Sequence, residues 1–502
     1  MKIKLIQVVL VVAIISIAFI YFFQNRLTSK QQSCLGCNLV VFDADIFRAD
    51  ALECDKHPEL TPNLCVIQND FIKFNNHYSN TDLTRPGVSS FLTSSYPSSH
   101  RVWDDFFFLD KKQPTIINLL KNNGYTTTIN GQTDSHQVQL ELFEKRIEDV
   151  LGNENVFNML NNEQVFLYFY SGVLHKPYLS DRGDSVPNHP NRPLGSPDNM
   201  RGFDEIGDKV IVEKYSYLLE KPAFKEFIKS QDGSINGIYP YMNYLCSDAS
   251  VEKRLVNVDA CWEITETIFD QYIDINNPVH IEFVKYLYQE RVRDLDVEIG
   301  RLINELKAFN LWDKTVFVIR SDHGEELAEH GEIGHSNNLY QELIRIPLWI
   351  YIPGVKAKNI NYISETIDEA PTLLKILGIE PHPLMAGRNL LVLNEGKDGD
   401  AVISQKKMSS VFSIREGDYK LISIGSNLES SERNSISYEL YNLQEDPGEK
   451  NNIVEENPEI KKRLLSNYYN KINQQPRFEP SYDLYKKLTN EQKNNIYENG
   501  YF

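Results

Sequence analysis

The chain has 502 residues, of which 41% are hydrophobic and 11% aromatic, a composition typical of a globular protein with a sizeable core. Its formal net charge of −18 argues against a nucleic-acid-binding role, because such proteins need basic surface to neutralise phosphates. The same charge means that any site for an anionic substrate must be made locally, by a metal ion or by a few cationic side chains.

The first 30 residues have the pattern of a membrane anchor. Lys2 and Lys4 precede an apolar run over residues 5–23, close to the roughly 20 residues that cross a bilayer. The run ends in bulky residues instead of a small-residue cleavage site, which favours an uncleaved anchor over a removed signal peptide. A short basic N-terminus usually stays inside, so we expect a single-pass protein whose remaining chain lies in the periplasm or outside the cell.

The six cysteines fall into three local groups, which are Cys34/Cys37, Cys54/Cys65 and Cys246/Cys261. An oxidising compartment permits disulfides, and pairing within each group is the simplest connectivity. A zinc site or a redox role for the first group is a weaker alternative, because a closed zinc site needs further cysteine or histidine ligands nearby.

Strand and helix signals alternate along the chain from residue 38 onward. Short apolar runs predict strands at 38–42, 125–129, 165–170, 316–319 and 347–352, and longer periodic segments predict helices at 115–123, 281–309 and 369–377. This alternation predicts an α/β fold with a mostly parallel central sheet and helices on both faces. Sites in such sheets lie at the carboxyl ends of the strands.

The predicted organisation has three parts. Residues 1–30 form the anchor, residues 31–384 the main domain, and residues 385–502 a small C-terminal α+β subdomain with a polar tail. The alternation is lost over 180–280, a stretch that begins rich in proline and glycine, and we interpret it as an insertion or lid.

Four places supply hard ligands or a nucleophile, which are Asp45 after the first strand, Thr84, Asp322 with His323 after the strand at 316–319, and His335. Asp45, His175 and Asp322 all lie at the carboxyl ends of predicted strands. Two carboxylates and an imidazole suit a divalent cation, and a hydroxyl beside such a cation, such as that of Thr84, becomes a usable nucleophile. Each residue alone also has a structural explanation, such as a helix cap or a turn, so the hypothesis depends on their joint occurrence.

Segments in chain order resemble those of the sulfatase-like family of the alkaline phosphatase superfamily. They are NLVVFDADIFRAD at 38–50, LTPNL at 60–64, LTRPGVSSFLTSSYP at 83–97, FLYFYSGVLHKPY at 166–178, SDHGEELAEHGEIGHSNNLYQELIRIP at 321–347 and ELYNLQEDPGEKNN at 439–452. The resemblance extends over about residues 38–455 and leaves the stretch 180–280 unmatched.

The resemblance implies a metal site with a nucleophile beside it. Asp45, Asp322 and His323 would bind the metal ion, and Thr84 would be the nucleophile and fourth ligand. His335 and His175 would contact the anionic group or the leaving oxygen. Asp43 is expected as a further ligand or behind the ligands, and Glu325 and His330 are expected in supporting or structural positions.

We expect one divalent ion, which could be calcium, manganese, zinc or magnesium. Two-zinc relatives in the superfamily add an Asp-x-x-x-His pair for a second metal. None of the eleven histidines of this chain has an aspartate four residues earlier. The sequence therefore predicts a single metal ion.

The nucleophile segment departs from the sulfatase pattern. Thr84 occupies the position that sulfatases oxidise to formylglycine, Val88 stands at the arginine position, and the family's lysine falls near Gln132. Threonine cannot be converted to the aldehyde, so its hydroxyl must attack directly, as in relatives that cleave or transfer phosphate groups. We therefore expect hydrolysis or transfer of a phosphate-type ester. Hydrolysis of sulfuric esters without formylglycine and a non-catalytic surface binding protein are the alternatives.

Overall fold

The computed structural model describes residues 33–103, 107–130, 142–147, 149–175, 273–335, 338–392, 401–406, 411–424 and 436–480. The predicted anchor, almost all of the predicted insertion, Gln132 and the Cys246/Cys261 pair lie outside these residues. Within them, no helix combines the length and the apolar character that a membrane span requires.

A sheet of eight strands forms the centre of the molecule, in the order β11-β2-β10-β7-β1-β6-β4-β5. The strands are β1 (Asn38–Ala44), β2 (Ile72–Phe74), β4 (Thr126–Asn130), β5 (Lys145–Ile147), β6 (Val165–Ser171), β7 (Thr315–Arg320), β10 (Leu348–Tyr351) and β11 (Lys358–Ile360). From β7 to β5 every neighbouring pair is parallel, whereas β10 runs antiparallel to both β7 and β2. The prediction of a mostly parallel sheet is confirmed.

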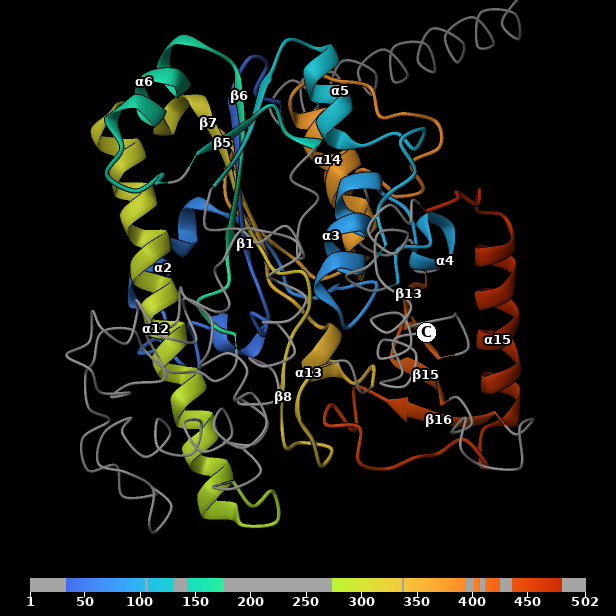
Figure 1. The fold of residues 1–502 in the computed structure, drawn as a ribbon. Helices are drawn as coiled ribbons and strands as arrows, with labels where there is room; N and C mark the ends of the chain where they lie inside the picture. Colours follow the sequence, from blue (N-terminus) through green and yellow to red (C-terminus); the bar gives the residue numbers. More distant parts are fainter. Residues whose placement is uncertain are drawn as a thin grey trace, which may run out of the picture.

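Helices cover both faces of this sheet (Figure 1). One face carries α2 (Pro62–Ile67), α6 (Glu154–Asn162) and α12 (Pro278–Ala308), and the other carries α3 (Thr84–Thr93), α5 (Ile116–Asn122) and α14 (Glu369–Ile376). Alternate residues of β1 supply the two cores: Val40 and Phe42 pack with α12, and Leu39 and Val41 pack with α3 and α14. Because both faces are covered, the central strands are continuous apolar runs, which is why the sequence reveals them.

A second sheet follows the main one and is antiparallel throughout. It consists of β13 (Val402–Gln405), β14 (Phe412–Glu416), β15 (Tyr419–Ile424) and β16 (Ser437–Asn442), with α15 (Pro458–Asn473) packed against it. Phe412 stacks on Tyr468 of α15 with ring centroids 3.6 Å apart. Tyr96 and Ile367 of the preceding domain belong to the same core, so this α+β unit docks directly on the larger one. The boundary at residue 385 stays a prediction.

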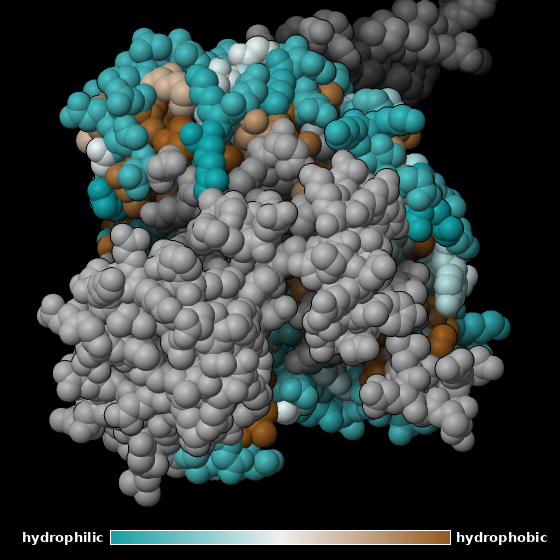
Figure 2. All heavy atoms as spheres, in the orientation of Figure 1, coloured by the Kyte–Doolittle hydropathy of each residue, from teal (hydrophilic) through white to brown (hydrophobic). Residues whose placement is uncertain are grey.

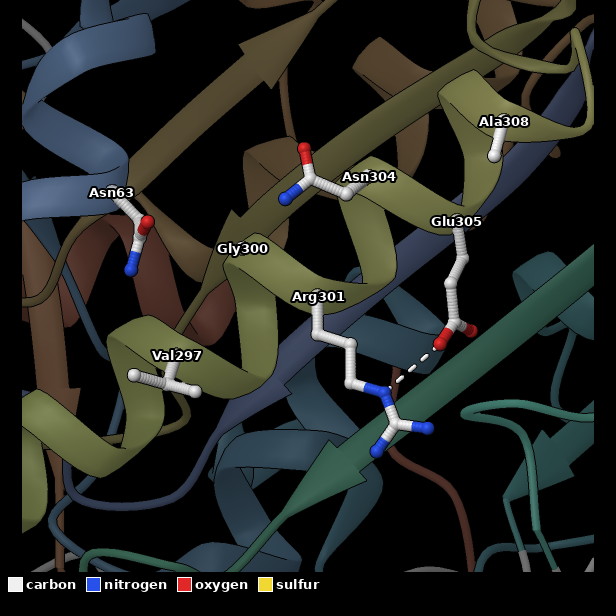
Figure 3. A pocket seen from close by; sticks show the side chains of 7 residues that line it. All are labelled: Asn63, Val297, Gly300, Arg301, Asn304, Glu305 and Ala308. Carbon is white, nitrogen blue, oxygen red and sulfur yellow. Dashed lines mark hydrogen bonds and ion pairs between the residues drawn. The ribbon is translucent and has the colours of Figure 1, made fainter.

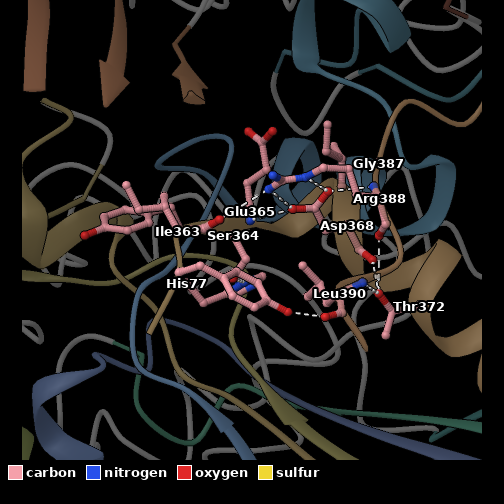
Figure 4. A network of polar contacts seen from close by, with 12 residues as sticks. His77, Ile363, Ser364, Glu365, Asp368, Thr372, Gly387, Arg388 and Leu390 are labelled. Atoms are coloured by element: carbon pink, nitrogen blue, oxygen red, sulfur yellow. Dashed lines mark hydrogen bonds and ion pairs between the residues drawn. The ribbon is translucent and has the colours of Figure 1, made fainter. Parts of the chain in front are cut away.

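Short elements connect these layers. They are β3 (His77–Tyr78), which pairs with β12 (Ser364–Glu365), β8 (Glu326–Leu327), which pairs with β9 (Ile333–Gly334), and the short helices α4 (Pro97–His100) and α13 (Gln341–Ile344). Figure 4 shows the polar network around β12, in which Arg388 reaches the carboxylate of Asp368 at 2.8 Å. This network fixes the connection between α14 and the second sheet.

Two of the three predicted disulfides join described residues. Cys34 bonds to Cys37 and Cys54 bonds to Cys65, as local pairing predicts. On the face shown in Figure 2, the described surface is mostly hydrophilic. Exposed large apolar side chains are scattered along the described chain, for example Leu35, Val66 and Val392.

Candidate active site

Three neighbouring strands end at one place on the sheet. In the order β7-β1-β6, the strands are followed by Asp322, Asp45 and His175 respectively. The N–H of Asp45 donates to the carbonyl of Ser171 at 3.0 Å, so the pairing of β1 with β6 continues to this residue. The carboxyl ends of parallel strands therefore gather the residues that the sequence predicts as a site.

Asp45, Asp322 and His323 are fully buried, and one ligand atom from each lies within 4.8 Å of the others. His323 Nε2 is 3.7 Å from Asp45 Oδ1 and 3.8 Å from Asp322 Oδ2. His323 Nδ1 lies 2.8 Å from the carbonyl oxygen of Gly324, which can only accept, so Nδ1 carries the hydrogen. Nε2 is then free to face the two carboxylates, the arrangement that a metal-binding histidine needs.

The two oxygens of Asp322 differ in their surroundings. Oδ1 accepts from the backbone N–H of His323 at 2.9 Å and from that of Ile46 at 3.3 Å. Oδ2 accepts no hydrogen bond from any described residue. Ile46 directly follows Asp45 and has a φ of 53°, which is strained for a β-branched residue. A buried oxygen without a partner and local strain in the backbone are both typical of a ligand-binding centre.

Thr84 is the first residue of α3 and lies beside these groups. Leu83 before it is extended, with φ −138° and ψ 143°, so the chain turns into the helix at the threonine. Thr84 Oγ1 lies 3.2 Å from His323 Nε2 and 3.4 Å from Asp45 Oδ1. The N-terminus of a helix also favours a bound anion through its free N–H groups.

The cluster of Asp45, Asp322 and His323 with the neighbouring Thr84 suits a divalent cation. Two carboxylates, an imidazole nitrogen and a hydroxyl offer the hard and borderline ligands that calcium, manganese, magnesium and zinc accept. Burial raises the pKa of Asp45, and the neighbouring charge of Asp322 raises it further. Burial by itself lowers the pKa of His323, but the carboxylates of Asp322 and Asp45 outweigh it and the pKa is raised. A cation among these groups would relieve the repulsion between the two acids.

Tyr170, near the end of β6, belongs to the site although sequence reasoning missed it. Its hydroxyl donates to Asp45 Oδ2 at 2.6 Å. Tyr168, two residues earlier, donates in the same way to Asp43 Oδ2. The sequence did contain a signal for these contacts: β1 ends in an Asp-x-Asp pattern, and β6 carries a Tyr-x-Tyr pattern. Alternate residues of a strand point to the same face, so two such patterns on neighbouring strands can meet.

Asp43 lies behind Asp45, Asp322 and His323 and is not part of that cluster. Its Oδ2 accepts from Tyr168 and from Arg320, and Arg320 Nε donates to Glu369 at 2.7 Å. His77 extends this series of polar contacts, because its Nε2 lies 3.1 Å from Glu369 Oε1. Burial raises the pKa of Asp43 to about 7, although the Arg320 charge opposes the rise. Asp43 was expected either as a further ligand or behind the ligands, and the geometry agrees with the second position.

Three imidazoles line one side of the site. The ring of His335 lies 4.6 Å from that of His323 and 5.5 Å from that of His175, measured between centroids. His335 Nδ1 is 2.8 Å from Oε2 of the fully buried Glu325. The carboxylate therefore orients the ring and leaves Nε2 for other contacts. Glu325 thus has the supporting position expected of it.

His330 lies in a separate cluster with two acids. Its Nδ1 is 2.5 Å from Glu342 Oε1, its Nε2 is 3.1 Å from the carbonyl of Glu449, and its ring stacks on Tyr340. Glu326 accepts from the backbone N–H of His330 at 2.8 Å. Because these groups already satisfy one another, we assign the cluster a structural role, in agreement with the expectation for His330.

Val88, which the resemblance puts at the arginine position of sulfatases, is a core residue. Its side chain is buried in the cluster between the sheet and α14. No cation from this position of α3 can therefore reach the site.

A hollow of about 450 Å³ lies on α12, away from the residues described above (Figure 3). It is lined by Asn63 of α2 and, on α12, by Val297, Gly300, Arg301, Asn304, Glu305 and Ala308. Arg301 and Glu305 pair with each other at 2.9 Å at its edge. None of the candidate site residues lines this hollow.

Residues 38–379 match the family model described as Sulfatase. The chain belongs to the sulfatase family. Residues 329–475 match a second model, described as N-sulphoglucosamine sulphohydrolase, C-terminal. Members of this family generally bind a divalent metal ion such as calcium, in keeping with the acidic cluster described above.

Named relatives are similar at low identity. Arylsulfatase K of Mus musculus is 22% identical, over 79% of this chain and 73% of that protein. N-acetylglucosamine-6-O-sulfatase of Bacteroides thetaiotaomicron is 22% identical, over 85% of this chain and 80% of that protein. Choline-sulfatase of Rhizobium meliloti is 23% identical, over 78% and 77% respectively.

Solved structures share the fold of this sulfatase-family chain. One, solved with its substrate D-glucosamine-2-N,6-O-disulfate, aligns with a TM-score of 0.60 at 20% identity, covering 87% of this chain and 98% of the other. Phosphonate monoester hydrolase of Agrobacterium radiobacter aligns with a TM-score of 0.55 at 16% identity, covering 87% and 96%. At these identities the likeness shows the fold alone.

Proposed function

We propose that this member of the sulfatase family cleaves a phosphate-type ester, or transfers its phosphate group, through a covalent intermediate on Thr84. In this proposal Asp45, Asp322 and His323 hold one divalent metal ion, and Thr84 is its fourth ligand. The observation that supports it is the position of Thr84 Oγ1, 3.2 Å from His323 Nε2 and 3.4 Å from Asp45 Oδ1. A threonine at this place cannot use formylglycine chemistry, so direct attack by its hydroxyl is the remaining route.

The reaction has two halves. The metal ion, when bound, lowers the pKa of the hydroxyl and stabilises charge on the ester oxygens. Thr84 Oγ1 bonds to phosphorus, its proton passes to Asp45 Oδ1, and the bond from phosphorus to the leaving alcohol oxygen breaks. His335, oriented by Glu325, donates a proton to that oxygen, with His175 beside it holding the anionic group. In the second half, water (hydrolysis) or an acceptor alcohol (transfer) bonds to phosphorus and gives its proton to His335. The bond from phosphorus to Thr84 Oγ1 breaks, and Asp45 returns its proton to that oxygen.

The test is cleavage of 4-nitrophenyl phosphate and of a bis-4-nitrophenyl diester by the purified full chain. We expect turnover that a chelator abolishes and that added divalent metal restores. Thr84→Ala should lower the rate by at least about 100-fold, because covalent catalysis is lost, whereas Thr84→Ser keeps the hydroxyl and should retain part of the activity. Equal rates for the wild type and Thr84→Ala would contradict the proposal.

A sulfuric ester is the second candidate substrate. The family model and the named relatives favour it, since arylsulfatase K, N-acetylglucosamine-6-O-sulfatase and choline-sulfatase are all sulfatases by name. The core valine at position 88 and the threonine at position 84 weigh against it. Rates on 4-nitrophenyl sulfate and 4-nitrophenyl phosphate, measured with the same preparation, decide between the two esters.

We also propose that residues 5–23 anchor the chain in a membrane, with the rest in the periplasm or outside the cell. The apolar run between basic residues supports this, and so do the local cysteine pairs. The full chain should stay with the membrane fraction after carbonate extraction, and a chain lacking residues 1–30 should not. Recovery of the full chain in the soluble fraction would contradict the anchor.

A further inference from the structure

The side chain of Arg48 connects the turn after β1 to the segment that contains Glu325. Arg48 follows Asp45 by three residues, and its side chain is 10% exposed. Its Nη1 donates to the carbonyl oxygen of Glu325 at 2.9 Å and to Glu329 Oε1 at 2.8 Å. Its Nε and Nη2 donate to the two carboxylate oxygens of Asp50, at 3.0 and 2.8 Å. One guanidinium therefore joins two segments that lie far apart in the chain.

The turn that contains Arg48 is held without the arginine side chain. The hydroxyl of Tyr288, on α12, accepts from the backbone N–H of Arg48 at 3.1 Å and donates to the carbonyl of Ile46 at 2.9 Å. The N–H of Phe47 donates to Ser321 Oγ at 2.9 Å. These contacts use only the backbone of residues 46–48. Asp45, directly before them, should therefore keep its place when the Arg48 side chain is changed.

Glu325 is held at its backbone and at its carboxylate. Its N–H donates to the carbonyl of Glu342 at 3.1 Å, and its own carbonyl accepts from Arg48. Its Oε2 lies 2.8 Å from Nδ1 of His335. A hydrogen bond from a charged donor is stronger than one between neutral groups, so the arginine fixes the carbonyl firmly. The direction of the Glu325 carboxylate, and with it the ring of His335, depends on that contact.

Glu329 ties a second part of this region to Arg48. Its Oε1 accepts from Arg48, and its Oε2 accepts from the backbone N–H of Leu327 at 2.6 Å. It thereby holds the turn between β8 and β9, and His335 directly follows β9. The guanidinium thus supports both the residue that orients His335 and the hairpin that leads to it.

We propose that Arg48 is a positioning residue that sets the orientation of His335 through Glu325 and so controls protonation of the leaving oxygen. The inference rests on the proposed function for the reaction and adds a residue that acts from behind the site. A well-placed general acid contributes about 100- to 10,000-fold to a rate, and a displacement of about 1 Å can cost about 100-fold. Arg48 acts on the departure of the alcohol and leaves the attack by Thr84 unchanged.

Two aryl phosphates separate this step from the others. 4-Nitrophenol leaves readily as an anion, whereas phenol, with a pKa of about 10, leaves well only when it is protonated. The quantity to measure is kcat/KM, which includes every step up to departure of the alcohol. In Arg48→Met, we expect it to fall about 10- to 100-fold for phenyl phosphate and less than about 3-fold for 4-nitrophenyl phosphate. A merely structural role would lower both values alike, so their ratio decides.

A double variant tests whether Arg48 acts through His335. His335→Ala should show the same dependence on the leaving group. Adding Arg48→Met to it should lower kcat/KM for phenyl phosphate no further, because both residues act on one step. Arg388→Met is the matched control: it removes an arginine that bonds to both oxygens of Asp368, at 3.2 and 2.8 Å, in the network of Figure 4. Its ratio of the two kcat/KM values should equal that of the wild type.

Arg48→Met should fold, because the two carboxylates that it leaves can reach water. The side chains of Asp50 and Glu329 are 51% and 25% exposed. Glu329→Gln is a milder variant that weakens the same contacts and should lower the ratio in the same direction; it decides in place of Arg48→Met if that variant does not fold. Equal losses for the two esters, or additive losses in the double variant, overturn the inference.

Failure of the proposed function gives a different result. If the wild type cleaves neither ester, that function fails, and crystal structures of the wild type and of the variant that folds decide about the positioning. Separation of His335 Nδ1 from Glu325 Oε2 beyond hydrogen-bond distance in the variant supports it. An unchanged contact overturns it.

Discussion

Each carboxylate oxygen of Asp45 has its own partner. Oδ2 accepts from the Tyr170 hydroxyl at 2.6 Å, and Oδ1 faces Thr84 at 3.4 Å and His323 at 3.7 Å. The Tyr170 hydroxyl therefore fixes the orientation of the carboxylate, with Oδ1 turned toward Thr84 and His323.

The Tyr170→Phe variant removes that hydroxyl and keeps the ring. We expect the dissociation constant for Mn²⁺ to rise about 10- to 100-fold, the usual effect of losing a group that orients a ligand. Metal titration of the purified protein by calorimetry measures this. Tyr125→Phe is the control, because its hydroxyl bonds to the carbonyl of Cys37 at 2.9 Å and touches no ligand. Equal metal affinity of the wild type and Tyr170→Phe would show that Asp45 needs no such support.

On the scale of elements, the approach of α3 to the end of β7 depends on a glycine. A Cβ on Gly87 would lie 2.9 Å from the carbonyl oxygen of Asp322 and 3.3 Å from its Cβ. Contacts this close force the helix away from the strand end. Since Thr84 begins this helix, the glycine keeps its hydroxyl within reach of Asp45 and His323.

The Gly87→Ala variant should therefore move Thr84 away from Asp322. We expect a loss of about 1–3 kcal/mol in the free energy of unfolding, as for other overpacked cores, together with weaker metal binding. Urea denaturation and metal titration measure the two effects. Gly448→Ala is a suitable control, because the nearest atom to its Cβ would be 3.9 Å away. Unchanged stability and unchanged metal affinity would rule out the close approach as a requirement.

The segment from β8 to α13 carries His335 and is held by the His330–Glu342 pair. Burial lowers the pKa of His330, but the Glu342 carboxylate outweighs it and the pKa is raised above its ordinary 6.5. Burial raises the pKa of Glu342, but His330 outweighs it and the pKa is lowered below its ordinary 4.5. The histidine contribution to stability is complete below pH 6.5 and is lost as the pH rises through the raised value; the glutamate contribution is complete above pH 4.5 and is lost as the pH falls.

The His330–Glu342 pair therefore contributes most to the stability of the folded protein between about pH 4.5 and 6.5. Glu342→Gln should lower the free energy of unfolding by about 1.5–3 kcal/mol in this window, as for a hydrogen bond between charged groups, and by less at pH 8.5. Thermal unfolding of both proteins at the two pH values measures the difference. Glu455→Gln, at an exposed position, should change little at either pH. A penalty for Glu342→Gln that is as large at pH 8.5 as at pH 5.5 would contradict the charged pair.

On the scale of the whole molecule, a buried ion pair inside the C-terminal unit holds the residue that connects this unit to the main domain, Glu449. Lys420 Nζ of β15 lies 2.7 Å from Glu449 Oε1, and both side chains are fully buried. Glu449 Oε2 also accepts from the backbone N–H of Gln341 at 2.6 Å, and its carbonyl accepts from His330. The C-terminal signature segment thus supports the loop that carries His335.

Lys420→Met should destabilise the protein by about 3–5 kcal/mol, because it leaves a buried carboxylate without its partner. The double variant Lys420→Met/Glu449→Gln should recover part of this loss, since the uncompensated charge is gone. Chemical denaturation measures both. Arg463→Met, which breaks the more exposed contact with Glu416 at 3.1 Å, should cost at most about 1 kcal/mol. If Lys420→Met is as stable as the double variant, the Glu449 carboxylate must be paired with another group.

Much of the fold follows from local patterns. The buried strands were found because continuous apolar runs between turn signals report burial on both faces, and α5 was found because Thr115 caps its start and Gly124 ends it. The direction of β10 was not found. The apolar residues of β10 are compatible with a parallel or an antiparallel strand, and its direction is set only by its pairing with β7 and β2.

The sequence by itself determined the candidate residues, which are acids and a histidine after two strands and a threonine before a predicted helical segment, and the order of segments that marks the family. Only the tertiary structure decided that Asp43 pairs with Arg320 behind Asp45, that the Tyr170 hydroxyl bonds to Asp45, and that the rings of His323 and His335 lie 4.6 Å apart. Local sequence encodes periodicity and burial, because these depend on neighbours along the chain. Which side chains meet depends on strand register and on the docking of separate units, and these arise from packing over hundreds of residues.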